Sequence, residues 1–397
     1  MRLTAEQDLM MSGAHGSVLQ RQMRLLARLG TVFGATEMVP IHSVQVSGVS
    51  YKSLGDPGLE FLEDLASQGA RVRVATTLNP AGMDLHDWRE MGVPADFAEK
   101  QLRIMAAFRA LGISASPTCA PYLTGNVPRA GEHVAWAESS AVSYANSVLG
   151  ARTNREGGPS ALAAALCGCT PKHGLHLSEN RQPHVVVEVA AKVTDNADFG
   201  ALGYLVGKKV KNRVPYFRGL EVPRNDDLKA LGAAMAASGA VALFHVEGVT
   251  PEAGDVDVED LPAIVVPQEE LDATYQALSS TEEAQLIVVG CPHASLSEIA
   301  VIAEKVRGRR LAAPLWICTA RATKDEAVQL GLDEVIQAAG GRIVADTCMV
   351  VSPLERMGVD ATAVTSGKAA SYLPGFCSQR VLFRRLDDLL RGGGMPQ

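Results

Sequence analysis

Three of the seven cysteines lie far apart in the sequence, at positions that suit a metal cluster. Cys119 lies between two prolines, and Cys291 and Cys348 each follow an apolar run that is typical of a buried strand. Thiolates that come from separate segments and meet at one point often hold an iron–sulfur cluster. No Cys-x-x-Cys pair accompanies them, so the residues alone leave open the alternative that all three are small core residues.

The other four cysteines carry weaker signals. Cys167 and Cys169 are separated by one residue, which makes a poor chelate, and they lie at the end of an Ala-rich run typical of a packed helix. Cys318 suits a ligand or a core position, and Cys377 lies in a late segment with no partner signal. Because an odd number of scattered cysteines favours a reducing compartment, we expect a cytoplasmic protein.

Charged residues next to glycines or apolar runs are the second group of candidates. Lys368 follows Ser366-Gly367, which resembles half a phosphate-binding loop without the upstream glycines of the Walker pattern. Lys368 could therefore contact an anion without belonging to a nucleotide site. Glu138 follows the apolar run 134–137, so its carboxylate must be paired or lie near a functional charge.

Asn154 and Arg155 precede Gly157-Gly158-Pro159, and a proline suits the first turn of a helix. A helix N-terminus attracts anions, and Arg155 could clamp a carboxylate or a phosphate there. The alternative is an ordinary capped helix with a solvated Arg–Glu pair.

Several function classes are disfavoured. No His-Glu-x-x-His, Gly-x-Ser-x-Gly or early dinucleotide-binding pattern is present. The net charge is −7 and aromatic residues make up 5%, so the basic and stacking surfaces of a nucleic-acid-binding protein are not expected. The longest uncharged runs fall short of the roughly 20 apolar residues that a membrane span needs.

The elements that must position these residues are clearest in the last third of the chain. Strands are predicted at 285–289, 314–318 and 342–346, each near a cysteine, and helices between them begin at the capping boxes Ser295-x-x-Glu298 and Thr323-x-x-Glu326. Alternating strands and helices predict a parallel sheet, whose carboxyl edge is where ligands bind.

Helical and extended patterns also alternate in the first part of the chain. We predict helices at 6–29 (broken at 12–16), 60–68 and 97–111, a β-rich segment at 38–49 and a strand at 71–77. In the last helix, Leu102, Met105, Ala106 and Arg109 lie at helical spacing. Residues 116–181 are rich in small residues and poor in strand patterns. These shifts predict approximate subdomains at 1–115, 116–230 and 231–380.

Eight segments resemble the aconitase X family, specifically its large catalytic subunit. They are residues 45–52, 76–84, 117–123, 131–140, 150–160, 290–293, 346–350 and 366–370. The resemblance extends from about residue 3 to residue 374, which is nearly the whole chain.

The resemblance implies an α/β, aconitase-like catalytic domain over 1–397, with parallel-sheet subdomains around a central iron–sulfur cleft. It implies an iron–sulfur hydro-lyase whose cluster ligands are Cys119, Cys291 and Cys348, whereas the other four cysteines fall outside the family's motifs. The substrate pocket that it implies is lined by Gly48, Val49, Ser50, Asn79, Pro80, Glu138, Ser139 and Lys368.

Family members also need a small swivelling domain that looks like the source of a catalytic serine. Nothing in this chain reads as that domain, so a small partner subunit is implied and the catalytic base stays unassigned.

Two substrates are known for the family. The composition looks bacterial, which favours dehydration of cis-3-hydroxy-L-proline to Δ1-pyrroline-2-carboxylate. Dehydration of mevalonate 5-phosphate is the alternative, and a non-catalytic ligand-binding or scaffold protein is the alternative from a different class.

Overall fold

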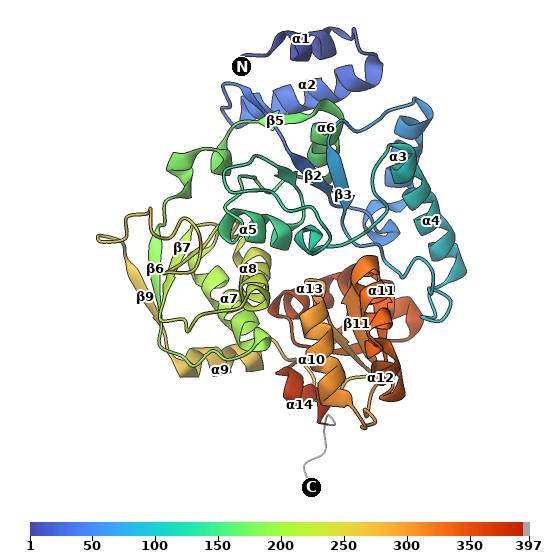
Figure 1. The fold of residues 1–397 in the computed structure, drawn as a ribbon, viewed down its shortest axis with the longest axis vertical. Coiled ribbons are helices and arrows are strands. Elements are labelled where there is room, and N and C mark those ends of the chain that lie inside the picture. The colour runs from blue at the N-terminus through green and yellow to red at the C-terminus, as the bar shows by residue number, and fades with distance from the viewer. Residues whose placement is uncertain (392–397) are drawn as a thin grey trace.

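The computed structural model describes residues 1–391 and divides them among three sheet-centred units. The first unit lies at the end that carries the N-terminal helices, and the second and third units lie side by side at the other end (Figure 1). All three main sheets are parallel, with helices in the connections, as the alternation of elements predicts. The predicted α/β class is therefore confirmed.

The first unit is built on a three-stranded sheet in the order β3-β2-β4. The strands are β2 (Ser43–Val46), β3 (Ala75–Leu78) and β4 (Ala135–Trp136), and a separate antiparallel pair joins β1 (Met38–Pro40) to β5 (Cys169–Pro171). The helices are α1 (Ala5–Ser12), α2 (Ser17–Val32), α3 (Tyr51–Ser67), α4 (Ala95–Ala110), α5 (Ser139–Ser147) and α6 (Gly158–Cys167).

The second unit holds a four-stranded sheet in the order β8-β7-β6-β9, for which the sequence yielded no prediction. Its strands are β6 (Val185–Val189), β7 (Pro215–Arg218), β8 (His245–Val246) and β9 (Ala263–Val266). Its helices are α7 (Asn196–Val210), α8 (Asn225–Gly239) and α9 (Gln268–Ala277). The division at 115 and 230 stays a prediction; position 230 lies inside α8.

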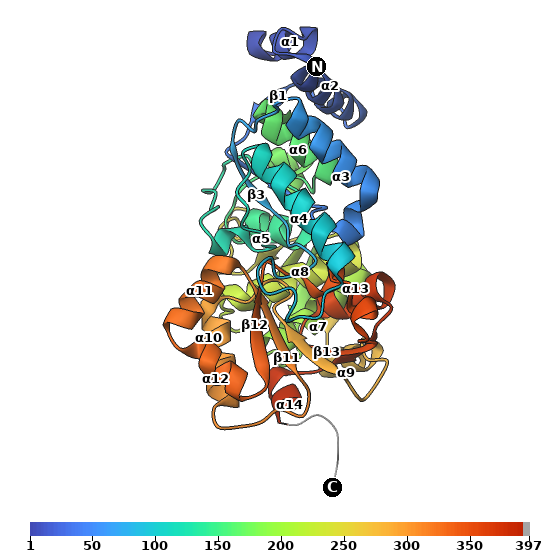
Figure 2. The same cartoon turned by 90° about the vertical axis from the view of Figure 1, so that its right-hand side faces the viewer.

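The third unit holds the predicted parallel sheet, with five strands in the order β12-β11-β10-β13-β14. Helices α10, α11 and α12 lie on one side of it and α13 on the other (Figure 2). The strands are β10 (Leu286–Val289), β11 (Leu315–Thr319), β12 (Gly341–Ala345), β13 (Ala361–Val364) and β14 (Arg380–Phe383). The helices are α10 (Leu296–Val306), α11 (Arg321–Gln329), α12 (Leu332–Ala338), α13 (Gly367–Cys377) and α14 (Leu386–Leu390).

Of the two predicted capping boxes, one is present in the structure and the other is not. Ser295 caps α10 and forms the box with Glu298, as predicted. The second prediction is wrong, because α11 already begins at Arg321 and Thr323 lies inside it as a buried residue. The predicted face of α4 is also wrong in part: Leu102 is 39% exposed, whereas Ile104 and Phe108 are buried.

Buried ion pairs join the first unit to the third. The Asp84 carboxylate contacts Arg321 and Lys324, and Arg321 also contacts Asp346, 2.6 Å away. Burial opposes ionisation of Asp84, but hydrogen bonds and these two cations outweigh it and lower its pKa to about 2. Asp346 lies two residues before Cys348, so this network holds one of the predicted cluster ligands against the first unit.

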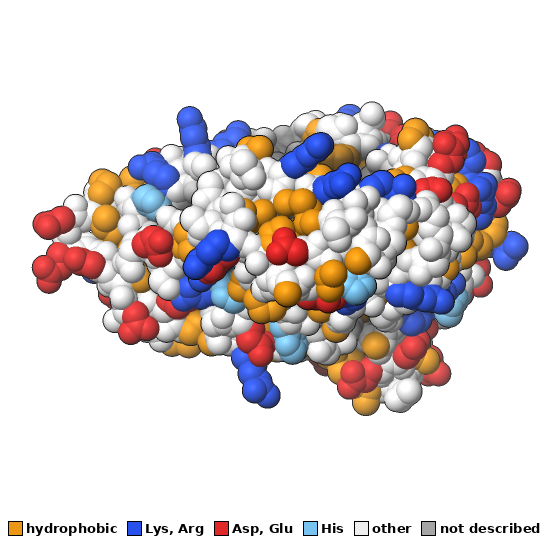
Figure 3. All heavy atoms as spheres, turned by 90° about the horizontal axis from the view of Figure 1, so that it is seen from above, with side chains coloured by type: hydrophobic (Ala, Val, Ile, Leu, Met, Phe, Trp, Pro, Cys, Tyr) orange, Lys and Arg blue, Asp and Glu red, His pale blue; other side chains and the backbone are white. Residues whose placement is uncertain are grey.

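On the face seen from above in Figure 3, acidic and basic side chains are interspersed, and neither sign of charge dominates. No helix within residues 1–391 has the length and apolar character needed to cross a bilayer.

Candidate active site

The predicted site residues follow the carboxyl ends of strands in two different sheets. In the first unit, β2 leads to Gly48, β3 to Asn79 and β4 to Glu138. In the third unit, β10 leads to Cys291, β12 to Cys348 and β13 to Lys368, which lies in the first turn of α13. Since carboxyl edges of parallel sheets bind ligands, the site is built where two such edges meet.

Backbone contacts join the two edges directly. Ala81 pairs with Thr347 in an isolated bridge, with the Ala81 N–H donating to Asp346 O at 2.8 Å and the Cys348 N–H donating to Ala81 O at 3.2 Å. The Ser50 hydroxyl donates to Val351 O at 2.8 Å. The segment that follows β3, from Asn79 to Ala81, therefore lies beside the segment that follows β12, from Asp346 to Cys348.

The segment from Gly48 to Ser50 forms the turn between β2 and α3. Gly48 has φ of 76°, a left-handed conformation that favours glycine. Val49 and Ser50 are both buried, and the Ser50 hydroxyl accepts a hydrogen bond from the Lys52 N–H at 3.2 Å, which caps α3. This turn presents a short stretch of backbone at the sheet edge.

Glu138 is the centre of the polar network. Its carboxylate pairs with the Lys368 ammonium and accepts hydrogen bonds from Asn79 Nδ2 at 2.7 Å, Ser139 Oγ at 3.3 Å and Ser140 Oγ at 3.1 Å. Burial opposes its ionisation, but Lys368 and these donors outweigh burial and lower the pKa of Glu138 to about 2. Burial also opposes the charge of Lys368, yet Glu138 raises its pKa above the usual value. The pair is therefore fully ionised at neutral pH.

Asn79 shows an unsatisfied position in this network. Its amide nitrogen is committed to Glu138, but its buried Oδ1 has no hydrogen-bond partner. A buried amide oxygen without a partner is costly, and a ligand that donates a hydrogen bond would remove that cost. Pro80 is buried beside it.

The three predicted cluster cysteines lie close enough to affect one another's ionisation. A hydrogen bond with Cys348 lowers the pKa of the Cys291 thiol and raises that of Cys348. Cys119 accepts a hydrogen bond from the His293 N–H at 3.1 Å, and burial raises its pKa to about 12. Lys368 favours the charged form of all three thiols.

This donor set fits an iron–sulfur cluster by its chemistry. Three thiol groups from three loops meet beside one buried cation, and sulfur is the ligand that such clusters take. Within residues 1–391, no group of three or more His, Cys, Asp or Glu side chains is arranged to hold a single metal ion. Sulfur ligands spaced for a cluster need not meet that single-ion arrangement.

Asn154 and Arg155 are placed differently. Asn154 Nδ2 donates to His173 O at 3.0 Å and its Oδ1 accepts from the Leu175 N–H at 2.9 Å, so the side chain fixes a neighbouring loop. Arg155 is exposed. Among the described residues, no hydrogen bond joins either of them to Glu138, Lys368 or the cysteines. Their role in substrate binding stays a prediction.

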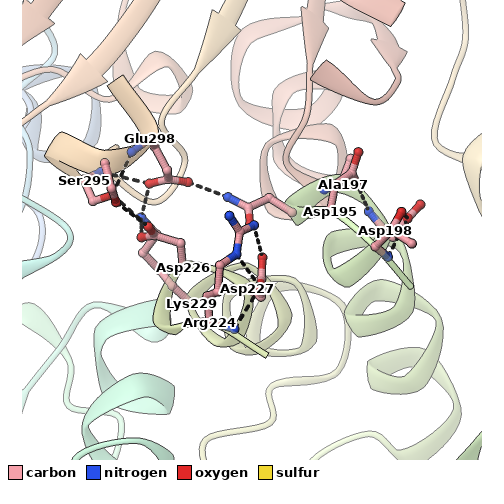
Figure 4. Close-up of polar contacts among 12 residues, drawn as sticks. Asp195, Ala197, Asp198, Arg224, Asp226, Asp227, Lys229, Ser295 and Glu298 are labelled. Carbon is pink, nitrogen blue, oxygen red and sulfur yellow. Dashed lines mark hydrogen bonds and ion pairs between the residues drawn. The ribbon is translucent and has the colours of Figure 1, made fainter. Parts of the chain in front are cut away.

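A cavity of about 350 Å³ lies between the second and third units, and Gly290 is one of the residues that line it. None of the predicted site residues lines it. Its walls carry more acidic than basic side chains: the acids are Asp195, Asp226, Glu298 and Asp387, and the bases are Arg224 and Lys305. Figure 4 labels four of them, Asp195, Arg224, Asp226 and Glu298. An anionic substrate is therefore disfavoured there.

Three residues of the network were not predicted from the sequence. Ser140 accepts a hydrogen bond from Lys368 Nζ at 3.1 Å, and Thr118 bonds the imidazole of His293 at 3.0 Å. The sequence could have indicated them only through their proximity to predicted site residues: Ser140 follows Ser139, Thr118 precedes Cys119, and His293 lies two residues after Cys291.

The chain is similar to known proteins of one family. Family models described as the aconitase X first, second and third domains match residues 1–179, 183–276 and 284–393. The phosphomevalonate dehydratase large subunit of Methanocaldococcus jannaschii is 52% identical over 99% of this chain and 100% of its own length. The cis-3-hydroxy-L-proline dehydratase of Pseudomonas aeruginosa is 39% identical over 97% of this chain and 68% of its own length. The crystal structure of Thermococcus kodakaraensis aconitase X in its holo form superposes with a TM-score of 0.94 at 46% identity, over 99% of this chain and 100% of that one.

Proposed function

Because this chain belongs to the aconitase X family, we propose that it is the large subunit of a phosphomevalonate dehydratase, an iron–sulfur hydro-lyase. The identity to named relatives carries the choice of substrate. Two large subunits of that name, from Methanocaldococcus jannaschii and Methanothermobacter thermautotrophicus, are each 52% identical to this chain, whereas the Pseudomonas aeruginosa hydroxyproline enzyme is 39% identical. The composition-based preference for cis-3-hydroxy-L-proline thus gives way to its alternative.

The reaction removes water across the carbon–carbon bond next to the substrate carboxylate. A C2–H bond and the C3–O bond break, a C2=C3 double bond forms, and the proton and hydroxyl leave as water. Bound at Cys119, Cys291 and Cys348, an iron–sulfur cluster would supply a Lewis acid for the departing hydroxyl. The remaining work falls to side chains that hold the substrate and move the proton.

Residues of this chain supply the holding contacts in this proposal. Lys368 provides the cation for a substrate anion, while Glu138 keeps it charged and oriented. Asn79 Oδ1 accepts a hydrogen bond from the substrate, which satisfies the buried oxygen. The turn from Gly48 to Ser50 adds backbone contacts. Such positioning contributes several kcal/mol to barrier lowering.

The proton acceptor is assigned to the partner. With a pKa of about 2, Glu138 is a weak base, so it serves the ion pair better than it serves proton abstraction. We place the base on a small partner subunit, which the words "large subunit" in the relatives' names support. The complex is expected in the cytoplasm, where thiolate ligands stay reduced.

The substrate choice is tested by turnover. The large subunit, purified anaerobically and combined with its small partner, should dehydrate mevalonate 5-phosphate with a kcat/KM at least about a hundredfold above that for cis-3-hydroxy-L-proline. Mevalonate without the phosphate is the matched control and should react poorly. Product formation is followed by the loss of water in mass spectrometry.

The other outcomes are equally informative. A preference for cis-3-hydroxy-L-proline would overturn the substrate and keep the hydro-lyase reaction. Turnover of neither compound by a complex that carries its cluster would favour a ligand-binding or scaffold protein.

A further inference from the structure

One histidine contacts the segments of all three predicted cluster ligands. His293 is 1% exposed and lies two residues after Cys291. Its backbone N–H donates to Cys119 Sγ at 3.1 Å. Its ring bonds the neighbours of two of the ligands, Thr118 beside Cys119 and Thr347 beside Cys348: Nδ1 lies 3.0 Å from Thr118 Oγ1, and Nε2 lies 2.8 Å from Thr347 O.

The partners of the ring fix where its proton lies. Thr347 O is a carbonyl and only accepts, so Nε2 must carry the hydrogen. Nδ1 of the neutral ring then accepts from the Thr118 hydroxyl, whose oxygen also accepts from the Ala120 N–H at 3.1 Å. Every hydrogen-bonding atom of the ring is thus used, and each bond ties one loop to another.

The backbone carbonyl of His293 is fixed by a buried lysine. Lys229, which is 3% exposed, donates from Nζ to His293 O at 3.2 Å and pairs with Asp226 and Glu298. Figure 4 shows Lys229, Asp226 and Glu298 together with Ser295, the cap of α10. A buried lysine with two carboxylate partners is a rigid support, so the His293 carbonyl is fixed relative to the second unit.

We propose that His293 is a positioning residue that clasps the three cysteine loops at the spacing required by the iron–sulfur cluster. This inference rests on the cluster of the proposed function. Its physical basis is that groups behind the ligands orient them, and hydrogen bonds to sulfur tune a cluster. The three loops are more than 50 residues apart in the chain, and the imidazole replaces the missing covalent link between them.

The test measures how the cluster is held. In His293→Leu, cluster loss to an iron chelator should be at least about tenfold faster than in the unsubstituted chain, with an altered visible circular dichroism spectrum. His293→Gln, whose amide can still donate to Thr347 O, should restore part of the retention. Thr118→Val removes the other ring contact with little change of shape and should act in the same direction as His293→Leu.

His245→Leu is the matched control. His245 is also 1% exposed and bonds a backbone carbonyl, Arg181 O, at 2.9 Å, but it contacts none of the three cysteines. It should leave cluster retention and spectrum unchanged. The melting temperature of each cluster-free variant shows whether it folds.

The outcomes separate this inference from the function it rests on. Wild-type retention and spectrum in both His293→Leu and Thr118→Val would overturn the role of His293 while leaving the cluster in place. If His293→Leu does not fold, cluster retention and the spectrum of Thr118→Val alone test the role of His293. An unsubstituted chain that binds no iron would overturn the proposed function and this inference together.

Discussion

Cys119→Ser, Cys291→Ser and Cys348→Ser should each lower the iron and sulfide content of anaerobically prepared protein by at least about tenfold. Each substitution replaces a soft thiolate with a hydroxyl that stays protonated at neutral pH, so one of three ligands is lost. The visible absorbance of the cluster should fall in parallel. Iron and acid-labile sulfide per chain are the quantities to measure.

The chain offers matched controls for these variants. Cys167 and Cys169 are also buried, but they lie at the end of α6 and in β5, where the nearby cation is Arg73 rather than Lys368. Cys167→Ser and Cys169→Ser should keep full iron. The ligand assignment is wrong if the three predicted variants keep iron and colour while Cys167→Ser or Cys318→Ser loses them.

Lys368→Ala should lower kcat/KM for mevalonate 5-phosphate by at least about a hundredfold, or about 2.7 kcal/mol, while the cluster spectrum persists. Lys368 is 6% exposed and is the cation bound to Glu138 beside the cysteines. Without it, the substrate loses its cationic partner. Steady-state kinetics of the reconstituted complex, together with the visible spectrum, measure both effects.

The same variant should also be less stable. Removing one partner of a buried ion pair costs about 3 to 5 kcal/mol, since Glu138 is left without a counter-charge. The pair holds the pKa of Glu138 at about 2, below its ordinary value of 4.5, so its stabilising effect is complete above pH 4.5 and is lost as the pH falls toward 2. The difference in unfolding midpoint between the two proteins should shrink over that range.

A second substitution separates stability from catalysis. Lys368→Met with Glu138→Gln removes both charges, so it should recover much of the stability but none of the activity. Lys209→Ala, which breaks the exposed pair with Glu270, is the control and should change neither. Near-normal turnover by Lys368→Ala would remove Lys368 from the substrate site.

The sequence predicted those elements whose signals are local. The break at 12–16 separates α1 from α2, Pro159 lies in the first turn of α6, and Ser295 caps α10, because each of these features depends on a few adjacent residues. The three strands near the cysteines were also predicted, since buried parallel strands are short apolar runs. Their parallel pairing in one sheet is confirmed.

The missed features depend on contacts between distant segments. The sheet of the second unit contains a strand of two residues, His245–Val246, whose pairing is determined by its neighbours rather than by its own pattern. The ion pair of Glu138 with Lys368 joins positions 230 residues apart. Their roles as site residues came from the family resemblance, and no periodicity predicts that the two side chains meet. Nor does any local pattern predict that His293 contacts Thr118 and Thr347.

The most direct test of the central claim is a titration of the anaerobic complex of large and small subunits with mevalonate 5-phosphate, followed by the visible and electron paramagnetic resonance spectra. We predict that the complex contains iron and sulfide and that the substrate changes the cluster spectrum at concentrations near its KM. The Cys348→Ser complex should show no such spectrum. A complex without iron, or a cluster whose spectrum is unaffected at saturating mevalonate 5-phosphate, would contradict the account.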